Sequence, residues 1–330
     1  MDTNVFIQNF LLAIFILFLA VLIDLVLGEP SWRPPYTFHP TVWMNRLAEK
    51  LLPYFRNKNA AVEKLNGVFL ALTVILVFVV PTYFLIKVVH SLLGILFYVP
   101  LAAIVLKTTF AIKLETDWAK AAAKQIQEND LSKAREIASM FSRRNTSNLT
   151  GPEVVSAIIE SMAENLTDFK LSPFFYYALF GVPGAVAFRV INTLDGTVGF
   201  KDPEHMHIGW FSASLDTLAN YVISRLSTIL IVLSSFLLNE NAHDAWRIAA
   251  RDRRKIASIN HGWPMAAMAG ALQVKLKKPG YYTVGDEIEQ LSTVHIYRAL
   301  KIRNVSLVLF SLLLVLPILF CLGLLGFPPI

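Results

Sequence analysis

The sequence predicts an all-α, polytopic integral membrane protein with four firm transmembrane helices, two broken or re-entrant apolar segments and large helical cytoplasmic loops. Of its 330 residues, 55% are hydrophobic and 16% are charged, and the mean hydropathy is +0.52. This composition excludes an ordinary soluble chain and a disordered or fibrous one. The apolar residues gather into runs long enough to cross a bilayer, and no stretch alternates as a strand would. We therefore expect residues 1–330 to form a single membrane-embedded domain.

Four apolar runs predict the firm helices, and they cover 5–27, 67–86, 92–112 and 305–327. The first run lacks the basic start and the small-residue cleavage site of a secretory signal, which indicates a retained helix. Asp24 lies near its inner end, where a carboxylate is costly in lipid, so we expect it to face protein or water. Only residues 87–91 separate the second run from the third, and this short connection predicts an antiparallel hairpin.

Two weaker apolar segments remain. Residues 174–191 contain Gly181 and Pro183, whereas residues 218–238 carry Asn220 and Arg225. Each segment can span the membrane, re-enter it or pack inside the protein. If both crossed fully, residues 192–195 would lie outside the cell, away from the basic loops. We therefore expect both segments to be broken or re-entrant and to line a cavity that opens to the cytoplasm.

Basic residues exceed acidic residues by 30 to 24, which gives a net charge of +6. Taken alone, this excess fits a nucleic-acid partner, an anionic lipid surface or cytoplasmic loops. The basic residues concentrate in three segments, namely 28–66, 113–172 and 239–304. By the positive-inside rule these segments are cytoplasmic loops of a multi-pass protein of the cell membrane, with lipid and not nucleic acid as a partner. The single cysteine, Cys321, excludes a disulfide framework and a cysteine-based metal site.

The segment 150–168 shows the clearest helix pattern. Thr150 and Glu153 have capping-box spacing, and the apolar residues fall on one side of the helix. The other side carries an acidic stripe, which includes Glu160, Glu164 and Asp168. This stripe is either a solvated face or a Mg²⁺ site, because Mg²⁺ prefers carboxylates among protein ligands.

Polar residues also cluster beside the two weaker apolar segments. One group is Asn192, Thr193 and Asp195, and the other is Asp216, Asn220 and Arg225. The spacing of the second group places its members near one helical face. Ionisable groups in or beside a membrane are costly, so these residues either serve the function or pair with each other, as Asp216 and Arg225 would.

Two basic groups are candidates for binding phosphate. Arg143 and Arg144 precede the acidic helix, and Lys255 ends a basic run that Asn260 and a Gly-Trp-Pro turn follow. Arginine offers the bidentate donors that a phosphate needs. Ordinary loop basicity and attraction to a membrane surface are the alternative explanations. None of the familiar nucleotide-binding motifs is present.

At these residues the sequence resembles the CobD/CbiB family of cobalamin biosynthesis, the membrane-bound adenosylcobinamide-phosphate synthases. The similar blocks run nearly end to end and are 24–30 with His39 and Pro40, 143–147, 160–168, 192–199, 215–225 and 260–270. The sequence departs from the family pattern at Glu29, Asn145 and Thr217, where the family usually has Asp, and at Ile223, where it usually has Pro.

The resemblance implies that the protein joins the propionate carboxyl group of adenosylcobyric acid to an amino-alcohol phosphate. The amine is (R)-1-amino-2-propanol O-2-phosphate or a close analogue such as ethanolamine phosphate. The family reaction depends on ATP, so ATP and Mg²⁺ are the expected cofactors. Association with other cobalamin-biosynthesis enzymes is a further expectation.

These implied roles fit the residues singled out above. A carboxylate must gain a leaving group before an amine can attack it, and phosphorylation supplies one. On this hypothesis Glu160, Glu164 and Asp168 hold Mg²⁺, whereas Arg143, Arg144 and Lys255 bind phosphates. Asp195 or Asp216 accepts the ammonium proton. The catalytic set is Glu164, Asp195, Asp216 and Lys255, and the other substrate-binding residues are His39, Asn165, Asn192, Thr193, Asn220, Arg225 and Asn260.

Two functions from other classes stay open. Polar residues within broken apolar segments are also typical of a transporter, here for an amphipathic or anionic solute. The large charged loops and the lack of an inverted repeat argue against a transporter. A membrane scaffold that gathers soluble corrinoid enzymes is the second alternative.

Overall fold

The computed structural model describes residues 3–29, 38–141 and 144–325 of the chain. Most of these residues are helical, 78% in all, which confirms the predicted all-α polytopic membrane protein. Five helical stretches are long and apolar enough to cross a membrane, namely Phe6–Leu27, Ala60–Leu93, Gly151–Val198, Trp210–Leu237 and Thr293–Leu324.

The helices form two compact units, and each unit is assembled from segments that are distant in the sequence. Unit 1 comprises Met1–Ala111, Ser172–Ala219 and Leu313–Ile330, and unit 2 comprises Ile112–Leu171 and Asn220–Leu312. Three of the four boundaries lie inside continuous helical stretches. No linker marks these boundaries in the sequence, which is why the sequence analysis expects one domain.

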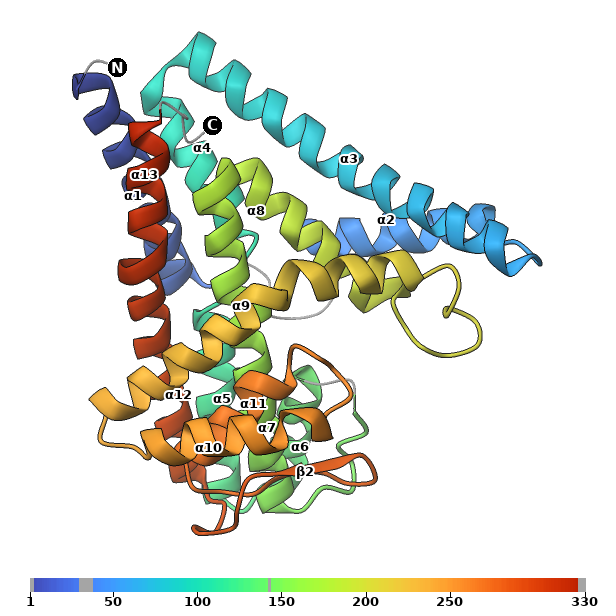
Figure 1. The fold of residues 1–330 in the computed structure, drawn as a ribbon, viewed down its shortest axis with the longest axis vertical. Helices are drawn as coiled ribbons and strands as arrows, with labels where there is room; N and C mark the ends of the chain where they lie inside the picture. The colour runs from blue at the N-terminus through green and yellow to red at the C-terminus, as the bar shows by residue number, and fades with distance from the viewer. Residues whose placement is uncertain (1–2, 30–37, 142–143, 326–330) are drawn as a thin grey trace. The chain divides into compact units, whose positions relative to one another are not determined.

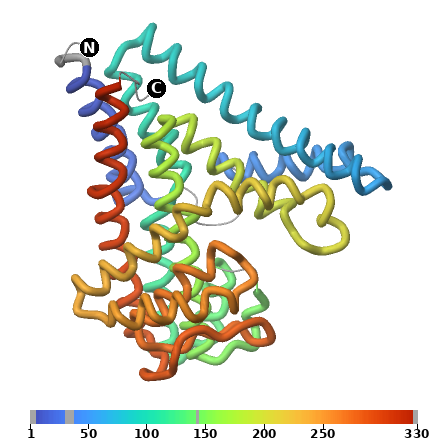
Figure 2. Tube along the Cα trace, viewed as in Figure 1, coloured from blue at the N-terminus to red at the C-terminus, as the bar shows by residue number. Residues whose placement is uncertain are grey.

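Unit 1 contains α1 (Thr3–Leu27), α2 (Pro40–Phe55), α3 (Ala60–Leu93), α4 (Ile95–Lys107), α8 (Ser172–Val198), the start of α9 (Trp210–Leu237) and α13 (Leu316–Leu324). In this unit α1 and α13 lie side by side (Figures 1 and 2). The rings of Phe6 and Phe10 on α1 meet the ring of Phe320 on α13 edge to face, with centroids 5.3 and 5.6 Å apart. Most apolar side chains of α1 and α3 remain uncovered, as expected for helix faces that contact lipid.

The hairpin between the second and third apolar runs forms, but its turn is not at residues 87–91. Helix α3 continues through that segment to Leu93, because the segment has neither Gly nor Pro. The break comes at Gly94, whose φ of +74° glycine adopts without the steric cost of a side chain. Helix α4 then has only 13 residues, or about 20 Å, less than the apolar core of a bilayer. The full span predicted over 92–112 is corrected to this short helix.

The two weaker apolar segments differ from each other. Helix α8 is kinked at Phe180 and Gly181, where φ is +66° at the glycine, so the break predicted in 174–191 is confirmed. Helix α9 runs through Asn220 and Arg225 without interruption. The break predicted in 218–238 is wrong, because that segment contains no Gly or Pro and both polar residues are compatible with a helix.

Unit 2 contains α5 (Lys113–Gln127), α6 (Leu131–Phe141), α7 (Gly151–Leu166), the π-helical turn η1 (Thr167–Leu171), most of α9, α10 (Ala242–Asp252), the 3-10 turn η2 (Arg253–Lys255), α11 (Gly262–Ala271), α12 (Thr293–Phe310) and the start of the π-helical turn η3 (Ser311–Val315). A short antiparallel hairpin joins β1 (Leu276–Lys278) to β2 (Tyr282–Val284), with Lys277 opposite Thr283. This hairpin was not predicted from the sequence. Its strands are too short to show alternation, although the Pro279-Gly280 pair between them is a turn signal.

Helices α10 and α11 pack closely because Gly270 has no side chain. A Cβ atom at Gly270 would lie 2.2 Å from the backbone oxygen of Asp244 on α10. We therefore expect Gly270→Ala to lower the free energy of unfolding by about 1–3 kcal/mol, since the two helices must separate. Gly151→Ala is the matched control, because a Cβ atom there meets no other atom within 4 Å. Equal thermal unfolding midpoints for the two variants in detergent would contradict this packing.

Candidate active site

Helix α7 carries the acidic stripe and begins as the sequence predicts. Thr150 and Glu153 form a capping box, in which the Thr150 backbone N–H donates to the Glu153 carboxylate at 2.9 Å. Most of the helix beyond this first turn is buried, and Glu160 is only 1% exposed. The interpretation of the stripe as a solvated face is therefore wrong for Glu160 and for Asp168, which is 6% exposed, whereas the Glu164 side chain is 38% exposed. Carboxylates buried in this way need partners.

Glu164 and Asp168 share a histidine. His261, which precedes α11, approaches Glu164 through Nδ1 at 2.6 Å and Asp168 through Nε2 at 3.1 Å. Asp168 lies in η1, and π-helical turns of this kind are rare and frequently accompany functional sites. Burial opposes a charge on His261, but attraction to the two carboxylates outweighs it and raises the pKa of His261 well above its usual value. The cluster thus places an imidazole ring between two carboxylates, an arrangement that favours its protonated form.

The same three residues fit a divalent cation. Glu164, Asp168 and His261 each offer a ligand atom, and these atoms lie within 4.8 Å of one another. Asp168 Oδ1 is buried and has no hydrogen-bond partner among the described residues. A buried acceptor without a donor is costly, and a cation bound there would satisfy it. The ligand group that the structure brings together therefore keeps Glu164 and Asp168 of the predicted set and adds His261.

Glu160, the third predicted ligand, has other partners. Arg144 Nη2 and the Tyr282 hydroxyl both donate to its Oε2 at 2.7 Å, and Ser156 donates to its Oε1 at 2.6 Å. Burial, and then the charge of Glu160, raise the pKa of Tyr282, which keeps this hydroxyl a donor. Glu160 and Arg144 thus neutralise each other within the fold. Arg143 lies outside the described residues.

A buried ion network fixes the η1 turn. Lys170 of η1 and Arg303 of α12 contact Glu115 of α5 at 2.7 and 2.6 Å, and all three side chains are buried. Burial favours the neutral form of Glu115, but attraction to the two cations outweighs it and holds the pKa of Glu115 below its usual value. In the same turn, the Thr167 hydroxyl donates to Ser227 on α9 at 3.1 Å. The turn that carries Asp168 is therefore tied to α5, α9 and α12.

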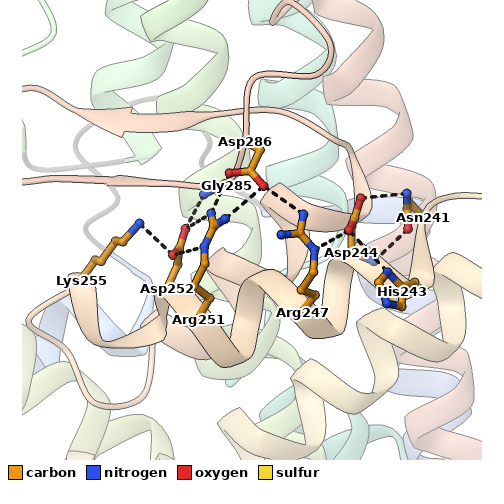
Figure 3. A network of polar contacts seen from close by, with 9 residues as sticks. All are labelled: Asn241, His243, Asp244, Arg247, Arg251, Asp252, Lys255, Gly285 and Asp286. Carbon is orange, nitrogen blue, oxygen red and sulfur yellow. Dashed lines mark hydrogen bonds and ion pairs between the residues drawn. The ribbon is translucent and has the colours of Figure 1, made fainter.

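Lys255 belongs to a different network, at the end of α10 (Figure 3). Its Nζ lies 2.8 Å from Asp252, and Arg251 donates to both oxygens of the same carboxylate at 2.7 and 2.8 Å. From the loop after β2, the Gly285 backbone N–H donates to Asp252 and the Asp286 carboxylate pairs with Arg251. The network fastens that loop to α10, and the charge of Lys255 is neutralised within it.

This network makes the stability of the fold depend on pH. Burial of Asp252 is outweighed by hydrogen bonds from Arg251, Lys255 and Gly285, which hold its pKa well below the usual value. A lowered pKa stabilises the fold above the unfolded-state pKa of about 3.9, and the stabilisation is lost as the pH falls through the folded-state pKa. We expect Asp252→Asn to lower the thermal midpoint at neutral pH, and we expect its difference from wild type to begin to shrink only as the pH falls below about 4. A midpoint difference that stays constant with pH would contradict this.

Unit 1 contains its own group of buried charges. Lys107 Nζ lies 2.6 Å from Glu29 Oε1 and 3.7 Å from Asp24 Oδ1. His39 caps α2, and its Nε2 lies 3.2 Å from Glu29 Oε2. Burial of Glu29 is outweighed by hydrogen bonds from His39 and Lys107, which lower its pKa. Asp24 is fully buried, which confirms that it does not face lipid.

Polar residues at the end of α8 form another group in unit 1. Arg189 Nη1 donates to Asn192 Oδ1 at 3.1 Å, and Asn192 Nδ2 donates to Asp216 Oδ1 at 3.2 Å. The structure thus brings together two of the predicted residues, Asn192 and Asp216. The Thr193 hydroxyl donates to the backbone oxygen of Arg189 at 2.8 Å, and Asp195 lies further along the same helix.

The remaining predicted residues lie in unit 2. Arg225 Nη1 donates to Asn260 Oδ1 at 2.7 Å, so these two residues lie together. Asn220 is fully buried on α9, and Asn165 is partly exposed near the end of α7.

Three residues that hold these groups together were not predicted as site residues from the sequence. His261 lies in the block 260–270, in which Asn260 was named as a candidate and His261 was not. Lys107 closes an apolar run and therefore looks like a helix boundary, and Arg189 looks like an interruption of a weak segment. The signal that identifies Lys107 and Arg189 is an ionisable residue within or at the end of an apolar run.

Comparison with known proteins places the chain in a family. The family model described as "CobD/Cbib protein" matches residues 17–305. The probable cobalamin biosynthesis protein CobD of Methanothermobacter thermautotrophicus is 37% identical over 297 residues, which cover 90% of this chain and 95% of the relative. The cobalamin biosynthesis protein CobD of Dehalococcoides mccartyi is 35% identical over 277 residues, which cover 84% and 88%. No solved structure matches the chain. The chain therefore belongs to the CobD/CbiB family of cobalamin biosynthesis proteins.

Proposed function

We propose that this protein is an adenosylcobinamide-phosphate synthase. It joins adenosylcobyric acid to (R)-1-amino-2-propanol O-2-phosphate, or to ethanolamine phosphate, in an ATP-dependent reaction. The observation that carries the proposal is the cluster of Glu164, Asp168 and His261 in a chain of the CobD/CbiB family. Amide synthesis from a carboxylate needs a cation to hold phosphates and groups that move protons, and two carboxylates with a histidine offer both.

Within this proposal each group of the cluster has a physical task. ATP with Mg²⁺ supplies the phosphoryl group that turns a propionate oxygen into a leaving group. Glu164 and Asp168 would hold the cation, which would satisfy the buried Asp168 Oδ1. Without a cation, the charged His261 ring keeps the two carboxylates from repelling each other. Asp216, to which Asn192 donates, and Asp195 belong to unit 1 and not to the cluster, and they stay the candidates for accepting the ammonium proton.

Incubation of detergent-purified protein with adenosylcobyric acid, Mg·ATP and either amine tests this function. We expect mass spectrometry to detect the amide, and we expect none when ATP is left out. Amide formation would exclude a pure transporter and a pure scaffold. A well-folded protein that forms no amide with either amine would contradict the proposal and reopen both alternatives.

We also propose that the basic segments and the active site face the cytoplasm at the cell membrane. Cys321 is the only cysteine of the chain and is exposed, so a Thr197→Cys variant is made together with Cys321→Ser. Thr197 lies on α8, where its hydroxyl donates to Asn45 at 2.6 Å. In intact cells we expect no reaction of this cysteine with an impermeant maleimide added outside, and labelling after permeabilisation. Ready labelling from outside would overturn the orientation.

A further inference from the structure

Arg225 and Arg253, both in unit 2, lie against one indole ring. The guanidinium carbon of Arg253 is 4.5 Å from the ring centroid of Trp263, and that of Arg225 is 5.8 Å from it. Arg225 also lies 3.6 Å from the ring centroid of Tyr221. The ring attracts each cation, but two cations beside one side chain repel each other. An anion bound by both would offset that repulsion.

No carboxylate neutralises this pair within the part of the chain that the structure describes. Arg225 donates to Asn260 at 2.7 Å and to Ser224 at 2.8 Å, and Arg253 donates to the backbone oxygen of Ala250. All of these acceptors are uncharged. By contrast, carboxylates bind most other arginines of this unit, namely Arg144, Arg247, Arg251, Arg298 and Arg303.

The surroundings of Arg225 favour a bound anion. Arg225 lies within α9, one of the helices that are long and apolar enough to cross a membrane, where an unneutralised guanidinium is costly. Ser224 is fully buried and Asn260 is 3% exposed, so both hold the guanidinium in place before any ligand arrives. Such preorganisation reduces the entropy that binding costs. Trp263 lies in the first turn of α11, which adds partial positive charge from the helix N-terminus.

We propose that Arg225 and Arg253 bind a phosphate group, while Trp263 keeps the two guanidinium groups together. The proposed function supplies one source for it, the phosphate of the amine substrate, and to that extent the inference rests on that function. His261, two residues before Trp263, belongs to the Glu164–Asp168 cluster, so the loop would bring this phosphate near the reacting groups. Arg144 and Lys255 serve this purpose less well, because Glu160 and Asp252 already neutralise them.

An anionic lipid headgroup offers the same chemistry as a free phosphate. Tyr221 and Ile259, beside Arg225, are 49% and 62% exposed, and such side chains suit a membrane interface. The experiment must therefore separate the two sources.

Isothermal titration of ethanolamine phosphate into the protein in phosphatidylcholine nanodiscs tests the site. We expect the Arg225→Gln/Arg253→Gln variant to bind at least about tenfold more weakly than wild type. Arg253→Gln alone should show a partial loss and should fold, because its only hydrogen bond among the described residues is to Ala250. The matched control is Arg247→Gln, which loses the same charge from a group that already pairs with Asp244. Ethanolamine, which lacks the phosphate, should bind wild type and every variant with the same affinity.

Nanodiscs that also contain phosphatidylglycerol identify the source of the phosphate. If this lipid competes with ethanolamine phosphate on wild type, and native mass spectrometry finds less of it on the double variant, the site is confirmed with lipid as its ligand. If neither ligand binds wild type, or if both bind the double variant equally well, the proposal is overturned. If phosphate binding depends on Arg225 and Arg253 but the protein forms no amide, the site is supported. Only the proposed function is then contradicted.

Discussion

Glu164→Gln is expected to lower the rate constant of amide formation by about 10²–10⁴-fold, the range typical for loss of a group that moves a proton or holds the reacting charge. The substitution keeps the size of the side chain and removes its charge. Glu164 then no longer attracts a cation, and His261 loses the negative charge that lies 2.6 Å from its Nδ1. Quantification of the amide by mass spectrometry over a range of substrate concentrations gives kcat and KM separately. We expect the change mainly in kcat.

Glu136→Gln on α6 is the matched control, because Glu136 is exposed and the substitution is chemically the same. It should leave both kinetic parameters unchanged. Asp168→Asn should resemble Glu164→Gln, and the double variant should be little worse, since residues that act as one unit are not additive. Wild-type kcat in Glu164→Gln, with an unchanged thermal midpoint, would remove Glu164 from the active site.

Glu115→Gln should lower the free energy of unfolding by about 3–5 kcal/mol, the usual cost of leaving a buried charge without its partner. Glu115 is the shared partner of Lys170 and Arg303, whose side chains are 0% and 1% exposed. The variant leaves both cations buried with a neutral amide between them. Chemical unfolding in detergent, followed by circular dichroism, measures the difference from wild type.

Lys170→Met separates the effect of charge from that of packing. It leaves Glu115 and Arg303 as a one-to-one pair, so each remaining buried charge keeps a partner of opposite charge. We expect it to destabilise the protein less than Glu115→Gln does. Equal losses in the two variants would show that the network contributes through packing and not through charge.

Patterns within short stretches of sequence correctly predicted those parts of the fold that depend on residues adjacent in the chain. The apolar run at 5–27 became α1, the capping box at Thr150 starts α7, and the kink of α8 falls at Gly181 as its composition suggests. The prediction of helix ends was wrong where a single residue decides where the helix stops. Gly94 ends α3, although the short charged segment 87–91 was predicted as the turn, and the glycine was the signal that this prediction overlooked.

The candidate site was predictable only in part, for the same reason. Helical spacing indicated that Glu160, Glu164 and Asp168 share one stripe, but their partners come from distant segments. Arg144 and Tyr282 donate hydrogen bonds to Glu160, whereas His261 contacts Glu164 and Asp168. Periodicity describes the face of a helix and carries no information on what covers it.

The ion network around Glu115 and the one around Asp252, both in unit 2, differ in their access to solvent. Lys170 and Glu115 are 0% and 7% exposed, whereas Arg251 and Asp286 are 40% and 37% exposed. Dissolved salt screens exposed charges over a Debye length of about 10 Å at 0.1 M and reaches buried pairs far less. Rising ionic strength should therefore loosen the loop after β2 from α10 while the turn that carries Asp168 stays fixed. The salt concentration of the buffer thus acts on the loop after β2 and spares the buried pair of Lys170 and Glu115.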